Sequence, residues 1–460
     1  MRLFLLALLG LLIGCTLTWW DFPLNLALPI FFFVLIMSIR FPAQLVVVLL
    51  GVSTMRILWL AGGIAPQELV YSFAFLFLLG ISFIREFVRV KEELRPAWAT
   101  PVALPIFCLG LVGIGATGVA ILRGHLFAHW ASDLNFILFF WLYFVVCFRF
   151  GGVRDIYRIL WPTFWITIGV IVWALGKRLI TQTLFVGLLP RFSRGAGFSS
   201  TLFLLSVCLF LFAEKGSLKR VGFFVASCFF GIHQFLSFVR TLWVAQIGTF
   251  GFLLLFLPFM VKRRFVRWTG ILFLLASLLL SFSWVAPTDD LLVKMPTFIM
   301  NRFLSIFTDV TGAGPSMRTR YAEWEAALKK FMEHPLTGNG LGTQIQFIRY
   351  DYARLPLTTE RYIHSSFIYY LLNTGPLGLA VFLWFCFCAV SYGIGVYRRA
   401  PTGELKGLAL GMTSSLFFQI LNSIASSELN HPARTIWTGF FLGALAVIDR
   451  EARQLKESAG

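Results

Sequence analysis

Long apolar segments follow one another along most of this chain, and they restrict it to folds that lipid can surround. A helix needs about 20 mainly apolar residues to cross a bilayer core, with about 17 as the lower limit. Because several of its candidate segments are short or crowded, we expect about 12–14 transmembrane helices. The candidates lie near residues 3–18, 23–39, 42–61, 69–84, 102–122, 134–150, 159–176, 197–213, 221–238, 243–261, 269–286, 365–391, 408–426 and 434–448.

Composition supports a helical membrane protein. Hydrophobic residues make up 58% of the chain and charged residues 13%, whereas soluble proteins average about 45–50% apolar and 25% charged residues. The apolar runs are continuous, while the strands of a membrane barrel alternate between apolar and polar residues. The sequence therefore predicts an all-α integral membrane protein. Its expected parts are transmembrane helices in 1–286, a large loop in 287–363, and further transmembrane helices with a tail in 364–460.

Lysine and arginine predict the orientation of the chain. They concentrate in alternate short loops and in both termini, which places these parts in the cytoplasm and the loop 287–363 on the opposite side. The net charge of +18 then reflects topology and contact with anionic membrane lipids. The basic residues are dispersed, so we expect no nucleic-acid partner. Arg56 lies inside a predicted span, and the sequence identifies no partner for it.

The sequence gives little support for a metal site or for disulfide bonds. All seven cysteines fall inside predicted spans, where they are typical of small packing residues. No cluster of histidine, cysteine, aspartate and glutamate has the spacing of metal ligands. We therefore expect no metal and no cofactor.

The large loop contains one predicted amphipathic helix. Pro315 is placed to begin it and Pro335 to end it. The expected apolar face, which should contact the membrane surface or the rest of the protein, consists of Tyr321, Trp324, Leu328 and Phe331. Three glycines at alternate positions follow (Gly338, Gly340 and Gly342), and they predict a turn more strongly than a phosphate-binding loop.

Three stretches of sequence around this helix form a recognisable pattern. They read NRFLSIF at 301–307, RTRYAEWEAALKKFMEHPLTGNGLG at 318–342 and HSSFIYYLLNTGPLGL at 364–379. In order and spacing they resemble the O-antigen ligase and O-antigen polymerase superfamily of bacterial inner-membrane glycan transferases. Weaker similarities are RFSRGAGFSS at 191–200 and SFVRTLWVAQIG at 237–248, where two residues separate Ser237 from Arg240.

The resemblance implies transfer of a glycan from undecaprenyl diphosphate to an acceptor hydroxyl on the periplasmic side of the inner membrane, without a metal. A ligase would transfer the finished polysaccharide to the lipid A-core during lipopolysaccharide assembly, and we favour this branch. A polymerase of O-antigen or exopolysaccharide would use the same donor but extend the next carrier-linked repeat. A pilin-glycosylating enzyme is a third alternative. A transporter is less well supported, because the interiors of the predicted spans contain almost no acidic residues.

The residue types suit this chemistry. A diphosphate is bound well by arginine, whose guanidinium can donate two parallel hydrogen bonds. Four arginines are expected at outer helix ends (Arg191, Arg194, Arg240 and Arg361), where the alternative is that they only anchor helices at the interface. His364 is expected to act as a general base toward the acceptor hydroxyl or to position the acceptor. Its alternative is a capping or packing role.

Overall fold

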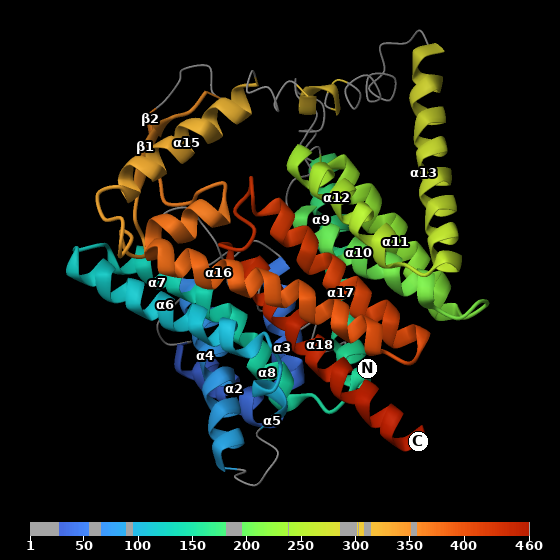
Figure 1. The fold of residues 1–460 in the computed structure, drawn as a ribbon, viewed down its shortest axis with the longest axis horizontal. Coiled ribbons are helices and arrows are strands. Elements are labelled where there is room, and N and C mark those ends of the chain that lie inside the picture. The colour runs from blue at the N-terminus through green and yellow to red at the C-terminus, as the bar shows by residue number, and fades with distance from the viewer. Residues whose placement is uncertain are drawn as a thin grey trace.

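Helices dominate the computed structural model of the chain (Figure 1). The structure describes residues 27–54, 66–88, 95–180, 196–237, 239–285, 301, 303–307, 314–350 and 357–459. Each predicted span after the first overlaps a helix, and the first, at 3–18, lies outside the described residues. The continuity of the apolar runs therefore located the helices correctly.

The helices before the large loop form two sets in sequence order. The first set is α2 (Ala27–Arg40), α3 (Pro42–Thr54), α4 (Pro66–Val88), α5 (Arg95–Trp98), α6 (Ala103–Leu122), α7 (Phe127–Leu138), α8 (Leu142–Arg149) and α9 (Val153–Ile180). The second set is α10 (Ala196–Phe212), α11 (Leu218–Leu236), α12 (Arg240–Phe256) and α13 (Phe259–Val285). After the loop come α16 (Ser366–Arg399), α17 (Gly403–Asn422) and α18 (Pro432–Ala459).

Within the described residues, four helical stretches are long and apolar enough to cross a membrane. They are Ala103–Leu122, Phe127–Arg149, Val153–Val172 and Ser366–Arg399. The second consists of α7, a 3-10 turn and α8 in direct succession. These stretches confirm the all-α membrane fold, while the total of 12–14 spanning helices stays a prediction.

The centre of the bundle is formed by the C-terminal helices. The helix α17 packs between α10 and α16, and α18 packs along α8. At the second contact the backbones come close together, because a Cβ on Gly443 would lie 2.9 Å from the carbonyl oxygen of Tyr143. Small residues permit such close approach between helices in lipid. The last helices therefore tie the N-terminal part of the chain to the part that follows the loop.

The loop between α13 and α16 contains the predicted helix and a hairpin that the sequence did not reveal. The helix α15 (Pro315–Phe331) begins at the predicted proline. Strands β1 (Ile345–Ile348) and β2 (Leu357–Glu360) then pair antiparallel, with Ile345 opposite Glu360. Figure 1 shows α15 and the hairpin together at one end of the bundle. This end is called the loop end below.

The buried face of α15 matches the predicted one only in part: Trp324 and Phe331 are partly buried and pack against the core, as predicted. Thr319, Glu323 and Ala327, spaced four residues apart, are buried. Tyr321 and Leu328 are 45% and 43% exposed, although the apolar pattern placed them on the contact face. The difference arises because the buried face carries a carboxylate and a hydroxyl that find polar partners in the protein, which a pattern of apolar residues cannot show.

The glycine-rich turn that follows α15 is wedged against the bundle. Gly338, Gly340 and Gly342 all have positive φ angles, between +69° and +84°. A Cβ on them would lie 2.4 Å from the backbone nitrogen of Gly375, 2.6 Å from that of Ala120 and 2.8 Å from that of Trp130, respectively. These glycines therefore allow close approach to α16, α6 and α7, and the turn predicted from the sequence is a protein contact.

Backbone hydrogen bonds fix the turn in place. Asn339 and Gly340 donate their N–H groups to the carbonyl oxygens of Leu372 and Asn373, at 2.7 and 3.0 Å. The guanidinium of Arg123 donates to the carbonyl oxygen of Gly338 at 2.7 Å. The turn thus joins α15 rigidly to the helices beneath it.

We expect Gly338→Ala to destabilise the protein more than Gly124→Ala. Their φ angles are nearly equal, +69° and +70°, so both substitutions should incur the cost of a non-glycine residue in this conformation, on the order of 1–3 kcal/mol. Only Gly338 adds a clash, because no atom lies within 4 Å of a Cβ on Gly124. Thermal unfolding of the purified variants in detergent measures the difference. Equal decreases in the unfolding temperature would show that the close packing around Gly338 does not contribute to stability.

Candidate active site

His364 lies in the short connection between β2 and α16 and is bound to α15. Its imidazole Nδ1 is 2.7 Å from Oε2 of Glu323. Its backbone N–H donates to the other carboxylate oxygen of the same residue. The Glu323 side chain is fully buried, whereas the side chain of His364 is 49% exposed. One buried carboxylate therefore fixes both the backbone and the ring of a half-exposed histidine.

This contact selects one tautomer of the histidine. When Glu323 is ionised its carboxylate only accepts hydrogen bonds, so Nδ1 of His364 then carries the proton that it donates to Glu323. In the neutral imidazole, the lone pair then resides on Nε2, which is the arrangement a general base requires. Nε2 of His364 can thus accept a proton.

Arg361 anchors the same connection to α7. Its Nε lies 3.5 Å from Oδ1 of Asp133, and Nη1 donates to the carbonyl oxygen of His129 at 3.0 Å. The side chains of Arg361 and Asp133 are 10% and 1% exposed. Burial opposes the charge, but Asp133 and Tyr362 raise the pKa of Arg361 above its usual value, so it stays cationic.

A second buried ion pair lies at the connection between α17 and α18. Nε of Arg434 is 2.7 Å from Oε2 of Glu428, with side chains 14% and 9% exposed. The amide of Asn430 donates to the carbonyl oxygen of Ile363, at 3.4 Å, and accepts from the hydroxyl of Ser366, at 3.0 Å. The connection that carries His364 therefore contacts α15 on one side and the α17–α18 loop on the other.

The predicted arginines are distributed unevenly. Arg361 is three residues from His364 and is engaged by Asp133. Arg240 begins α12, and its Nη1 donates to the hydroxyl of Ser305 at 3.1 Å. Figure 1 shows that α12 begins at the loop end, where α15 also lies. Arg191 and Arg194 fall outside the described residues, as does Arg56.

Sequence reasoning did not identify Glu323, Asp133 or Arg434 as members of this site. Glu323 follows Thr319 by four residues and precedes Ala327 by four, and this spacing of small and polar residues was the available signal. Asp133 and Arg434 lie far along the chain from His364, so only the fold brings them near. Among the described residues, no group of three or more histidine, cysteine, aspartate or glutamate side chains is arranged to hold a metal.

We expect Arg361→Ala to lower the unfolding temperature, because it leaves the Asp133 carboxylate buried without its cation. Removing one member of a buried ion pair costs about 3–5 kcal/mol. The control is Glu325→Ala, which breaks an exposed pair with Lys329 on α15 and should leave unfolding unchanged. Detergent-solubilised protein is sufficient for this measurement. If Arg361→Ala unfolds at the same temperature as the control variant, the ion pair between Arg361 and Asp133 does not stabilise the fold.

A family model overlaps these residues in the sequence. The family model of O-antigen ligase matches residues 225–383, a range that contains α15, Glu323, Arg361 and His364. No curated protein matches the chain. The family supports a glycan-transferring activity of the ligase or polymerase kind. Over residues 225–383, the chain is similar to the O-antigen ligase superfamily.

Proposed function

We propose that the protein is an O-antigen ligase that transfers a polysaccharide from undecaprenyl diphosphate to a hydroxyl of the lipid A-core. The observation that carries the proposal is the contact between His364 and the buried Glu323, at 2.7 Å. It lies within the residues that the family model matches. A half-exposed histidine with a fixed tautomer is suited to take a proton from an acceptor hydroxyl.

The proposed reaction is a single displacement at the anomeric carbon of the donor glycan. The acceptor oxygen forms a bond to this carbon while the bond from the carbon to the diphosphate oxygen breaks. The hydroxyl proton passes to Nε2 of His364, and undecaprenyl diphosphate leaves with the bonding electrons. Because the donor is already activated, no further energy source is required. Glu323 acts as a positioning residue that orients the ring and stabilises its charge.

We propose that arginines bind the diphosphate in place of a metal ion. Arg240 is at the start of α12 and faces Ser305, so it is a candidate that the fold places at the loop end. Arg191 and Arg194 remain candidates from the sequence alone. The guanidinium of Arg361 already has an aspartate and backbone carbonyl oxygens as partners. We therefore assign it to positioning the His364 connection.

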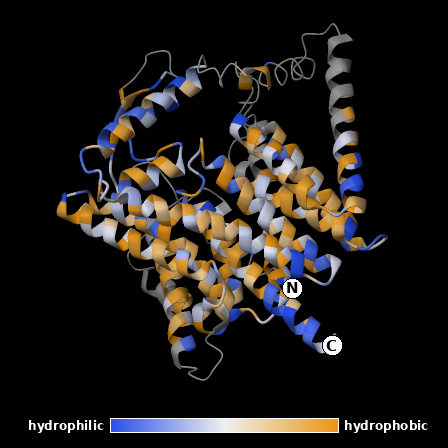
Figure 2. Cartoon of the chain, viewed as in Figure 1, coloured by the Kyte–Doolittle hydropathy of each residue, from blue (hydrophilic) through white to orange (hydrophobic). Residues whose placement is uncertain are grey.

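The same proposal includes the orientation of the protein in the membrane. The loop end would face the periplasm, with both termini in the cytoplasm of a bacterium and the bundle in its inner membrane. Basic residues end several helices at the opposite side of the bundle, among them Arg40, Arg85, Arg149 and Arg399. Figure 2 shows the hydrophilic end of α18 projecting from the apolar bundle. Such segregation is the expected pattern for cytoplasmic loops.

We expect His364→Ala to abolish O-chain attachment in cells that lack the native copy, because it removes the proton acceptor. Lipopolysaccharide should then run as core alone, while long glycan accumulates on the carrier. Glu323→Gln should lower the transfer rate by about 10–100-fold, by analogy with the loss of carboxylates that orient metal-bound histidines. Gel profiles and an assay of carrier-linked glycan provide the measurement. His334→Ala is the matched control, because His334 is exposed in the turn after α15.

The same experiment distinguishes ligase from polymerase. Core that carries a single repeat in the deletion strain would identify a polymerase, whereas an unchanged profile would contradict both activities in lipopolysaccharide assembly. Full attachment by His364→Ala would contradict the proposed role of the histidine, provided that the variant is present in the membrane at the level of the wild type.

A further inference from the structure

Three arginines from three helices line one cavity at the side of the bundle opposite the loop end. The cavity has a volume of about 300 Å³, and its lining includes Arg40 at the end of α2, Arg85 near the end of α4 and Arg149 at the end of α8. Ser82 and Glu86 also contribute to the lining. Three arginines and one glutamate therefore contribute to the lining, which gives the cavity an excess of positive charge.

Internal contacts orient one of these arginines, and the other two are exposed. Nε of Arg149 donates to the hydroxyl of Ser82 at 3.2 Å, which holds its guanidinium against α4. Arg40 and Arg85 are exposed. Within the described part of the chain, neither of these two has a carboxylate within ion-pair distance. Arginine binds phosphate oxygens with two parallel hydrogen bonds, so this combination favours a phosphate-bearing anion.

The length of α4 separates the cavity from the loop end. Its first turn contains Glu68, on which the charge of Arg361 acts. Arg85 lies 17 residues further along the same helix (85 − 68), which corresponds to about 26 Å at 1.5 Å per residue. The hydrocarbon core of a bilayer is about 30 Å thick. This rise is close to the thickness of the hydrocarbon core, which would place the cavity among the headgroups of the leaflet opposite the loop end.

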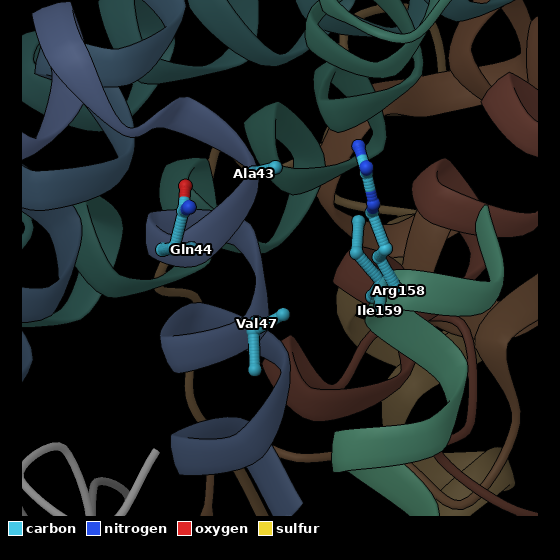
Figure 3. A pocket seen from close by; sticks show the side chains of 5 residues that line it. All are labelled: Ala43, Gln44, Val47, Arg158 and Ile159. Carbon is cyan, nitrogen blue, oxygen red and sulfur yellow. The ribbon is translucent and has the colours of Figure 1, made fainter. Parts of the chain in front are cut away.

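An apolar cavity lies directly beside α3. It begins at Ala43, one residue after the Pro42 that borders the arginine cavity, and has a volume of about 340 Å³. Figure 3 shows Val47 and Ile159 in its wall, with the polar ends of Gln44 and Arg158 extending in the same direction. A polar headgroup site and an apolar wall are thus close together, as a phospholipid would require.

We propose that Arg40, Arg85 and Arg149 form a binding site for a phosphate group, supplied by an anionic glycerophospholipid or by free phosphate. The guanidinium groups would contact the phosphate oxygens, and Ser82 would keep Arg149 in place. A basic cavity between helices at this depth is the expected recognition site for an anionic lipid headgroup. The site is separate from His364 and does not depend on the proposed transfer reaction.

The test uses the full-length protein in neutral detergent and native mass spectrometry of bound phosphatidylglycerol and phosphatidylcholine. The wild type should prefer phosphatidylglycerol, and the double variant Arg40→Gln with Arg85→Gln should bind it at least about tenfold more weakly. A matched control, Arg154→Gln with Arg267→Gln, removes the same charge from exposed positions outside the cavity and should bind like the wild type. The lysine variants at 40 and 85 should retain much of the binding, because they keep the charge.

Competition identifies the source of the phosphate. If millimolar inorganic phosphate displaces phosphatidylglycerol from the wild type, the phosphate group alone is sufficient for binding. If it does not, while the glutamine variant still loses the lipid, the site recognises the phospholipid. The proposal is overturned if the glutamine variant binds phosphatidylglycerol like the wild type, or if the control loses as much affinity. Size-exclusion profiles confirm that each variant is folded before the comparison.

Discussion

The buried carboxylate of Asp133 connects the parts of the protein on which the candidate site depends. One of its oxygens accepts the backbone N–H of Gly342 at 2.9 Å, and the other pairs with Arg361 at 3.5 Å. Since Asp133 belongs to α7, a single side chain holds both the glycine turn after α15 and the connection before α16. A buried charge is stable only when paired and hydrogen-bonded, so these segments must assemble together.

The position of His364 follows from this assembly. The glycine turn fixes the end of α15, and α15 in turn presents Glu323 beneath the histidine. The α17–α18 loop holds the other side of the connection through Asn430. Because the supports come from rigid helices, the imidazole is held in one orientation before any substrate binds. Preorganisation of this kind reduces the cost of bringing reacting groups together.

The sequence predicted the features that follow from local pattern. Continuous apolar runs located the helices, Pro315 marked the start of α15, and the three glycines indicated a turn. The hairpin escaped prediction because its strands have only four residues each, and LTTE has no apolar alternation. The role of Glu323 was not predicted, because the apolar residues of α15 suggested a different buried face. Its importance depends on His364, which lies 41 residues away in the chain, and such pairings are determined by tertiary packing.

The tautomer of His364 is the most direct test of the account, because the proposed chemistry requires its Nε2 to be free. Nitrogen-15 NMR of histidine-labelled protein in lipid can report it, with His364→Gln used to assign the signal. Because Nδ1 contacts the Glu323 carboxylate, the neutral ring should carry its proton on Nδ1, and Glu323→Gln should change this signal. A neutral ring protonated on Nε2 would contradict the account, because that nitrogen could not then accept a proton from an acceptor hydroxyl.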